Sequence, residues 1–335
     1  MRPAARMTGS AATAPARVSP GASGTATAAP VYTMTGSGGA GATTVCPTGA
    51  AVFLRMRESI TTITTGSDPA ATTIAPGTGA TDVNTFTLQT NFGTETVSSV
   101  TVNLSTNIGV GTLAITDAAN TVLGSTSAPV TGSNTISVTG MSASTTLTSF
   151  KLRVTPLSHA AMPAVPGAAY SITAPVTAWA GANAHTGTDT NANALTIDNL
   201  SPASATVTSG SLGYLANSLN WTSSSSSDFN TTGGAVVYRW GATSAGSEVP
   251  AEGSSPAAGA TNGTATVACL VSCGISQMVS VVDGSGGSGG CLTTALTAGQ
   301  NYTYKVFQRD IYGNYDAGVL IGTFRPYGAM RAATS

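Results

Sequence analysis

The sequence predicts an all-β protein in which two tandem β-sandwiches follow a low-complexity N-terminal arm. Three observations support this fold class. Thr, Val, Ile and Tyr, which favour the pleated and half-buried surface of a sheet, are frequent, whereas helix formers such as Glu, Lys and Gln are scarce. Apolar and polar residues alternate in short runs. Turn residues separate these runs at the spacing that is typical of a sandwich.

The N-terminal arm, residues 1–45, is rich in Ala, Gly, Thr, Ser and Pro. This composition buries too little side chain to offset the entropy of ordering, so a loose tail is expected. Val31–Thr35 alternates as a short strand does and is a candidate for pairing with another subunit. Met1–Pro30 lacks the apolar segment of a secretory signal peptide, which indicates a misassigned start, a longer parent chain or another export route.

Residues 46–200 are expected to form the first sandwich. Phe150, Leu152 and Val154 alternate with Lys151 and Arg153, which predicts a strand with one face in the core and one in water. No 3.6-residue periodicity, which paired helices would need, is found in this region. Further alternating runs lie at 86–88, 100–104, 113–115, 136–138 and 170–176.

The segment Asp198–Pro202 indicates a boundary, after which residues 201–327 are expected to form the second sandwich and 328–335 a tail. Gly284–Gly290 is a Gly- and Ser-rich stretch that can fold back freely. The strands of this region are expected at 219–221, 235–240, 264–270, 302–307 and 319–324.

Three sequence features of the second region are typical of one domain type. Trp221 lies on its expected second strand, Leu296–Tyr302 has the spacing of a tyrosine corner, and Asp310–Tyr315 has the pattern of a last hairpin turn. On these residues, about 202–326 resembles a fibronectin type III domain. The resemblance implies a structural core that contains Trp221, Leu296, Tyr302 and Tyr304, with the Tyr302 hydroxyl bonded to nearby backbone. The stretch from Thr264 to Cys291 departs from the family pattern as a long insertion. The first sandwich is expected to be immunoglobulin-like.

From about Tyr32 to Asp316, the chain also resembles repeat units of large secreted proteins of metal-respiring bacteria. In those proteins such sandwiches accompany modules with CxxCH haem motifs. This chain has no CxxCH, and neither of its His residues follows a Cys, so no covalent haem is expected. The resemblance implies an extracellular or cell-surface location rather than an activity.

Composition excludes several classes of function. Charged residues make up 7% of the chain, against about 25% in ordinary domains, and the net charge is −1. No basic stripe is available for nucleic acid, so no nucleic-acid partner is expected. No apolar run approaches the roughly 20 residues that span a bilayer, so no membrane span is expected.

The sequence offers no catalytic constellation, and we expect no enzyme and no cofactor. Gly36–Gly41 fits a dinucleotide fingerprint, but no helix follows it. Gly286–Gly290 fits a nucleophile elbow, but its flanks are β and no His lies near it. The isolated residues His159 and His185 are interpreted as exposed loop residues. Four carboxylates are interpreted as solvated surface groups: Glu58, Glu95, Glu248 and Glu252.

No metal site is expected, although two segments are weak calcium candidates. Asp189, Asn191 and Asn193 alternate like the start of a calcium loop, but the later Gly and bidentate Glu of an EF-hand are missing. The second candidate set is Asp310, Asn314 and Asp316. The alternative for both sets is an Asx turn, in which the side chain caps its own backbone.

Two surface features leave modification and sugar binding open. Trp179, Trp240 and Tyr312 are the aromatic residues outside the expected cores that are candidates for a carbohydrate platform. N-glycosylation sequons, which this composition produces readily by chance, occur at Asn103, Asn199, Asn220, Asn230, Asn262 and Asn301.

The four cysteines allow three pairings. Cys269 ends an expected strand, and a bridge to Cys291 closes a loop of about 20 residues, worth roughly 3 kcal/mol in the chain-entropy model. We favour this pairing, with Cys273 as the rival partner of Cys291. Cys46 is then left with Cys273, either free or paired between chains.

The sequence therefore predicts a non-catalytic extracellular or cell-surface structural protein: a filament or surface-layer subunit, or an adhesive spacer. It is expected to self-associate or to bind other surface proteins. The alternative is a carbohydrate- or partner-binding accessory module of a larger secreted protein, with polysaccharide as its ligand.

Overall fold

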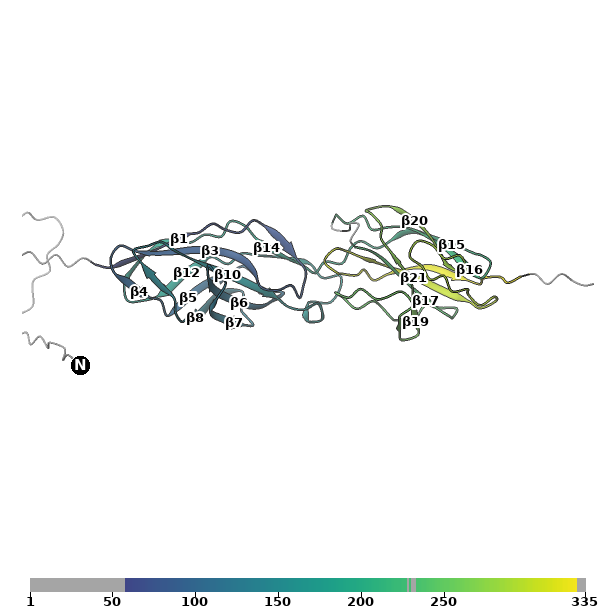
Figure 1. Ribbon diagram of the computed structural model, residues 1–335, viewed down its shortest axis with the longest axis horizontal. Helices are drawn as coiled ribbons and strands as arrows, with labels where there is room; N and C mark the ends of the chain where they lie inside the picture. Colours follow the sequence, from purple (N-terminus) through teal and green to yellow (C-terminus); the bar gives the residue numbers. More distant parts are fainter. Residues whose placement is uncertain (1–57, 228, 230–232, 330–335) are drawn as a thin grey trace, which may run out of the picture. The chain divides into compact units, whose positions relative to one another are not determined.

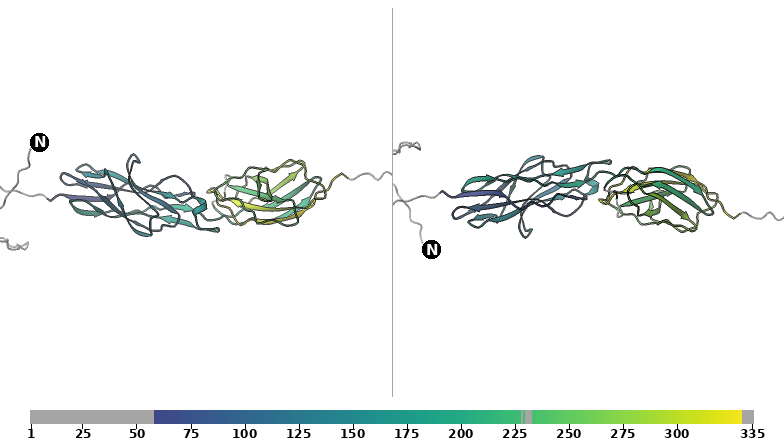
Figure 2. Two further views of the ribbon diagram at one scale, coloured as in Figure 1. Left: turned by 90° about the horizontal axis from the view of Figure 1, so that it is seen from below. Right: turned by 90° about the horizontal axis from the view of Figure 1, so that it is seen from above.

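A computed structural model describes residues 58–227, 229 and 233–329. It confirms the all-β fold class. In Figure 1 and in both views of Figure 2, β1–β14 and β15–β22 form two groups of strands. The arm 1–45, Cys46, Asn230 and the end of the tail lie outside the described residues, and the domain limits stay predictions.

The largest sheet has six strands in the order β13-β1-β3-β10-β6-β7. Only the pair β1 and β13 is parallel; the other neighbours are antiparallel. The strands are β13 (Ala184–Thr188), β1 (Ile60–Thr65), β3 (Thr81–Thr90), β10 (Thr148–Pro156), β6 (Val110–Asp117) and β7 (Val122–Ser127).

Three smaller sheets complete the first group, together with the 3-10 helix η1 (His159–Ala161). The first contains β12 (Val176–Ala180), β5 (Ser99–Leu104) and β8 (Gly132–Ser137), and the second contains β11 (Ala169–Ile172), β14 (Leu195–Asp198) and β2 (Thr72–Ile74). The third contains β4 (Thr94–Thr96) and β9 (Ser142–Ser144).

Strand β10 shows why this sequence forms these sheets. Phe150, Leu152 and Val154 are at most 3% exposed and pack in one core with the inward residues of β3, β5 and β6. Lys151 and Arg153 point to the other face, where both form ion pairs with Asp82 at 3.1 and 2.7 Å. The two-residue period therefore separates core from solvent as the sequence predicts.

The second group contains two sheets. One is β15 (Thr206–Leu212), β16 (Ala216–Thr222) and β20 (Met278–Gly284) in that order. The other has the order β18 (Thr261–Asn262), β19 (Ala265–Val271), β17 (Gly234–Trp240), β21 (Tyr302–Arg309) and β22 (Val319–Phe324). Strand β20 lies in the stretch that the sequence analysis took for an insertion. That expectation was wrong, because Val279 and Val281 alternate and are buried opposite β16.

The core between these two sheets contains Trp221, Tyr304 and Leu219, each 0% exposed. Tyr302 is half-buried, and its hydroxyl accepts a hydrogen bond from the Thr297 N–H at 3.0 Å. This is the geometry that the tyrosine-corner spacing implies. Leu296 is also buried.

No helix in the described part of the chain is both long and apolar enough to cross a membrane.

Replacing Trp221 with Ala is expected to lower the free energy of unfolding by about 3–5 kcal/mol, because it removes a large, fully buried side chain. Urea denaturation followed by fluorescence of the remaining Trp residues measures this. Leu320→Ala, at a side chain that is 54% exposed, is the control and should change stability little. Equal midpoints for the two variants would contradict the burial of Trp221.

Candidate functional site

Strand β17 is buried on both faces. Ala235 and Val237 point into the core between the two sheets, whereas Val236, Tyr238 and Trp240 belong to a second apolar cluster on the other face. A strand that reads as a continuous apolar run needs a cover on each side. The second cover is the segment 241–260 between β17 and β18, whose Ala245 packs against this cluster.

Two glutamates hold the covering segment in place. Glu248 accepts hydrogen bonds from the Thr264 hydroxyl (2.6 Å) and N–H (2.7 Å) and from the Trp240 indole N–H (3.0 Å). These bonds, the Thr264 hydroxyl first, lower the pKa of Glu248 to about 2. Glu252 accepts the Tyr315 N–H at 2.9 Å. The expectation of a solvated surface group was wrong for Glu252, which burial shields from solvent, whereas nothing contradicts it for Glu248.

Burial gives Glu252 an unusual protonation behaviour. It raises the pKa of Glu252 to about 7, and the nearby charges of Asp310 and Asp316 act in the same direction. Burial also raises the pKa of Asp316 to about 6 and that of Tyr315 to about 12. Around neutral pH this part of the molecule therefore exchanges protons, although carboxylates ordinarily do so near pH 4.

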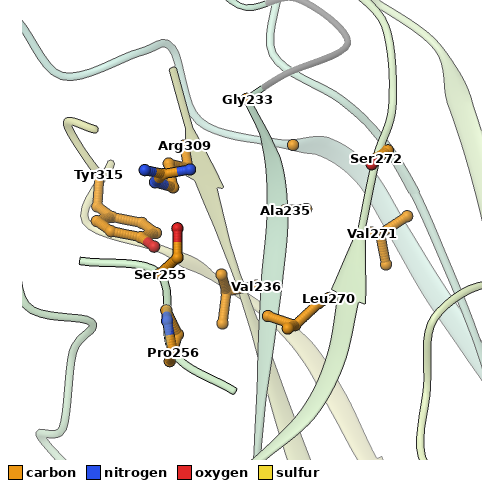
Figure 3. Close-up of a pocket in the computed structure, with 11 residues that line it drawn as sticks. Gly233, Ala235, Val236, Ser255, Pro256, Leu270, Val271, Ser272, Arg309 and Tyr315 are labelled. Carbon is orange, nitrogen blue, oxygen red and sulfur yellow. The ribbon is translucent and has the colours of Figure 1, made fainter. Parts of the chain in front are cut away.

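A pocket of about 150 Å³ opens where the covering segment meets β17 and β21. In Figure 3 the side chains of Arg309, Tyr315 and Ser255 are drawn toward one end of the pocket, and Pro256 and Leu270 toward the other. The Arg309 guanidinium lies 5.9 Å from the centre of the Tyr315 ring. Tyr315 itself is buried, and its hydroxyl donates to the Ser254 carbonyl at 2.8 Å.

Arg309 is the residue of this pocket that is best suited to bind a ligand. No carboxylate of the described residues lies within 4.0 Å of its guanidinium. Its Nε is buried and has no hydrogen-bond partner in the described parts of the chain. The pocket lining includes no His, Cys, Asp or Glu, so it offers neither a general base nor metal ligands.

The sequence analysis did not single out Arg309. A signal was present, because the apolar run Ala235–Trp240 predicts a strand that is covered on both faces. What the run does not show is that Gly234 pairs with Arg309 in the β17–β21 ladder and that the covering segment ends beside it.

The first group of strands contains a buried acid that was expected at the surface. Glu95, on β4, is 2% exposed. Burial raises its pKa, but hydrogen bonds from Thr61, Asn183 and His185 outweigh this effect and leave the pKa below its ordinary value. The Asn183 N–H donates at 2.8 Å, and His185 Nε2 lies 3.4 Å away. Glu95 is thus a structural acceptor that ties β4 to the chain entering β13.

The two histidines depart from the expected exposed loop residues in different ways. His185 is exposed, as expected, but lies on strand β13, with its ring 4.4 Å from that of Trp179. His159 opens the 3-10 helix η1 and is half-buried, and burial lowers its pKa. His185 was read as a loop residue because its polar stretch gives no sign of the ladder in which it pairs with Thr61.

The first set of calcium candidates, Asp189, Asn191 and Asn193, forms hydrogen bonds with distant segments of the chain. Asp189 accepts from the Asn84 side chain (2.7 Å) and the Val176 N–H (2.8 Å). Asn191 accepts the Ala174 N–H, and the Asn193 side chain donates to the Pro69 carbonyl.

The second candidate set behaves in a similar way. Asp310 accepts the N–H groups of Tyr312 and Asn314, as an Asx turn does, and Asp316 accepts the N–H groups of Gln308 and Gly318. Within the part of the chain that the structure describes, no group of three or more acidic, His or Cys side chains is arranged to hold a metal ion.

Cys269 and Cys291 form a disulfide, the pairing that the sequence analysis favoured. Cys273 is a buried free thiol, and burial raises its pKa to about 11. A thiol this inaccessible and this poorly ionised is not poised to pair between chains.

The remaining candidates for sugar binding and for glycosylation differ in how far they are exposed. Trp240 is 2% exposed and cannot be a sugar platform, so that expectation was wrong; Trp179 and Tyr312 are half-buried. Asn199 is buried and donates to the Pro163 carbonyl at 2.9 Å, which removes it as a glycosylation acceptor. Asn103 and Asn262 are exposed, whereas Asn220 and Asn301 are half-buried.

Comparisons with known proteins return no family model and no curated protein that matches. Solved structures are matched at 9–12% identity and TM-scores of 0.13–0.22. They include a biofilm associated protein (BSP domain; 12% identity, TM-score 0.19), the chicken CNTN1 FN1–FN3 domains (11%, 0.22) and a β-1,2-glucanase from Parabacteroides distasonis (12%, 0.19).

The matches cover 79%, 78% and 82% of this chain and 30%, 67% and 37% of the respective matched chains. This chain therefore spans less than a third of the biofilm associated protein and a little over a third of the glucanase. With TM-scores this low, the fold assignment rests on the strands and sheets described above.

Glu252→Gln is expected to flatten the pH dependence of stability. The folded-state pKa of Glu252, about 7, lies above the ordinary value of 4.5, so the native state binds more protons than the unfolded state between these values. Stability is therefore lost as pH rises from about 4.5 to 7. Gln cannot ionise but keeps an oxygen for the Tyr315 N–H. Since Glu252 is only half-buried, the gain at pH 8 is discounted to about 1 kcal/mol.

Thermal melts from pH 4.5 to 8 measure this effect, with Glu58→Gln as the exposed control. The Glu252→Gln variant should match the wild type at pH 4.5 and exceed it at pH 8. Asp316 contributes a slope of the same sign below about pH 6, and this slope remains in the variant. Parallel curves for the wild type and Glu252→Gln would refute the assignment.

Proposed function

We propose that this chain is a non-catalytic structural module of an extracellular or cell-surface protein, which self-associates into a filament or layer or serves as an adhesive spacer. The observation that carries the proposal is the outer face of the six-stranded sheet. There Thr188, Thr64, Thr87 and Ser149 stand opposite one another on β13, β1, β3 and β10. Thr64 and Thr87 share a hydrogen bond between their hydroxyls at 2.6 Å.

Hydroxyls hydrate this row of residues, and the charges on the same face, Lys151, Arg153 and Asp82, pair with one another. Thr188, Thr64 and Ser149 are exposed, and Thr87 is buried between its neighbours. With a net charge of −1 over 335 residues, identical copies repel one another little. Electrostatic repulsion therefore opposes the close packing of many copies less than it would for a strongly charged chain.

The location is supported by the disulfide. Cys269–Cys291 lies within the core of the second group of strands. Disulfides persist in oxidising compartments and are rare in the cytosol. The secreted setting that the sequence resemblance implies is part of the same proposal.

The alternative function is a binding module for a polysaccharide or another surface partner. The pocket beside Arg309 favours this candidate, because a cation that pairs with none of the described carboxylates is suited to bind a ligand at a concave site. The two functions are compatible, since an assembled module can also present a binding site.

Sedimentation velocity of the full chain at concentrations from about 1 to 100 µM tests the structural role. Complexes held by weak interfaces become populated in about this range. The mass of the full chain is expected to grow with concentration, with little dependence on salt because few charges are involved. Limited proteolysis should cleave the arm 1–45 in dilute protein and spare it in the assembly. A chain that stays monomeric and is retarded in a polysaccharide-affinity gel would support the binding module instead.

A further inference from the structure

We propose that the pocket beside Arg309 binds a carboxylate-bearing sugar, namely a hexuronate unit of an acidic polysaccharide. The inference goes beyond the structural role proposed above and does not depend on self-association. It rests on the charge of Arg309, the size and lining of the pocket, and the place of the pocket in its sheet.

Arg309 supplies the anion-binding group. Its guanidinium presents N–H donors in a fixed plane that matches a carboxylate. One side of the group is taken by the Tyr315 ring at 5.9 Å. No carboxylate of the described residues pairs with it, and its buried Nε lacks a hydrogen-bond acceptor there. Buried donors are satisfied in most proteins, so an unused one at a pocket indicates a place for an acceptor.

The surroundings select an anion with a single charge. Glu252 and Asp310 act electrostatically on Tyr315, and Asp310 and Asp316 act on Glu252, so the region already carries negative charge. Arg309 is the only cationic residue of the pocket lining. A carboxylate needs one positive partner, whereas a phosphate dianion would meet one cation and several carboxylates.

The size and polarity of the pocket suit one sugar ring. At about 150 Å³ it is smaller than the roughly 300–1,000 Å³ of sites for drug-sized ligands. Val236, Leu270 and Pro256 form an apolar part against which the C–H face of a pyranose can pack, and the exposed Ser255 hydroxyl can donate to or accept from a sugar hydroxyl (Figure 3).

The sheet argues against an extended peptide as the ligand. Peptides that add to a sheet need an edge strand with free N–H and C=O groups. The pocket lies over β17, which is paired with β19 on one side and β21 on the other. A polymer that presents its side group into the pocket needs no such edge.

The test is isothermal titration calorimetry of the full chain with three probes: oligogalacturonate, oligoglucuronate and alginate oligomers. A neutral galactan oligomer is the uncharged control. At least one uronate should bind ten-fold or more tightly than the galactan. Arg309→Gln should weaken that binding at least ten-fold, and Arg309→Lys should weaken it less, because Lys keeps the charge without the planar fork.

Two further variants make the result specific. Ser255→Phe fills the pocket from an exposed loop position and leaves Arg309 in place, so it should remove binding even if Arg309→Gln does not fold. Arg325→Gln removes an Arg whose Nε bonds the Gly299 carbonyl outside the pocket, and it should bind as the wild type does. Thermal melts check that each variant is folded.

Three outcomes would overturn the proposal: binding to none of the uronates at millimolar concentration, equal binding by the wild type, Arg309→Gln and Ser255→Phe, or tighter binding of a peptide with a free C-terminal carboxylate. None of them bears on the sedimentation result, so failure of the sugar site and failure of the structural role are told apart.

Discussion

The Arg239 guanidinium and the Asp283 carboxylate form an ion pair inside the second group of strands, with Nη1 3.0 and 2.8 Å from the two carboxylate oxygens. Asp283 is 0% exposed and also accepts the Tyr304 hydroxyl at 2.8 Å, and that hydroxyl in turn accepts from Asn217. Burial raises the pKa of Asp283, and the Arg239 charge opposes this. Losing one partner of such a pair leaves a buried charge uncompensated. The network joins β17 and β21 of one sheet to β16 and β20 of the other.

This pair also determines which side chains of β17 face outward. With Arg239 held toward Asp283, its neighbours Tyr238 and Trp240 must point to the opposite face, because side chains alternate along a strand. A slip of one residue would reverse every side chain of β17. The second apolar cluster, the covering segment 241–260 and the pocket beside Arg309 all depend on this register. One buried ion pair therefore organises both faces of the sheet.

Both proposed roles depend on how few charged residues this chain has. The outer face of the six-stranded sheet is hydrated by Thr and Ser, so copies can approach with little electrostatic repulsion. Among the described residues, ion pairs join Asp82 to Lys151 and Arg153, and Asp283 to Arg239. Arg309 forms no ion pair with a described carboxylate and also lines a pocket, which suits it to recognition.

The sequence by itself determined the features that depend on neighbours along the chain: the alternation of Phe150, Leu152 and Val154, the Leu296–Tyr302 corner, and the favoured Cys269–Cys291 pair, whose loop is short. It was wrong about Glu95, Glu252, Trp240 and the strand β20. The burial of each depends on residues that lie far away in sequence, such as Asn183 for Glu95 and Tyr315 for Glu252. Only the tertiary structure decided the burial and the pKa of these residues, because both depend on which side chains pack against them from other strands and loops. The two-residue periodicity of a strand carries no information about those distant neighbours.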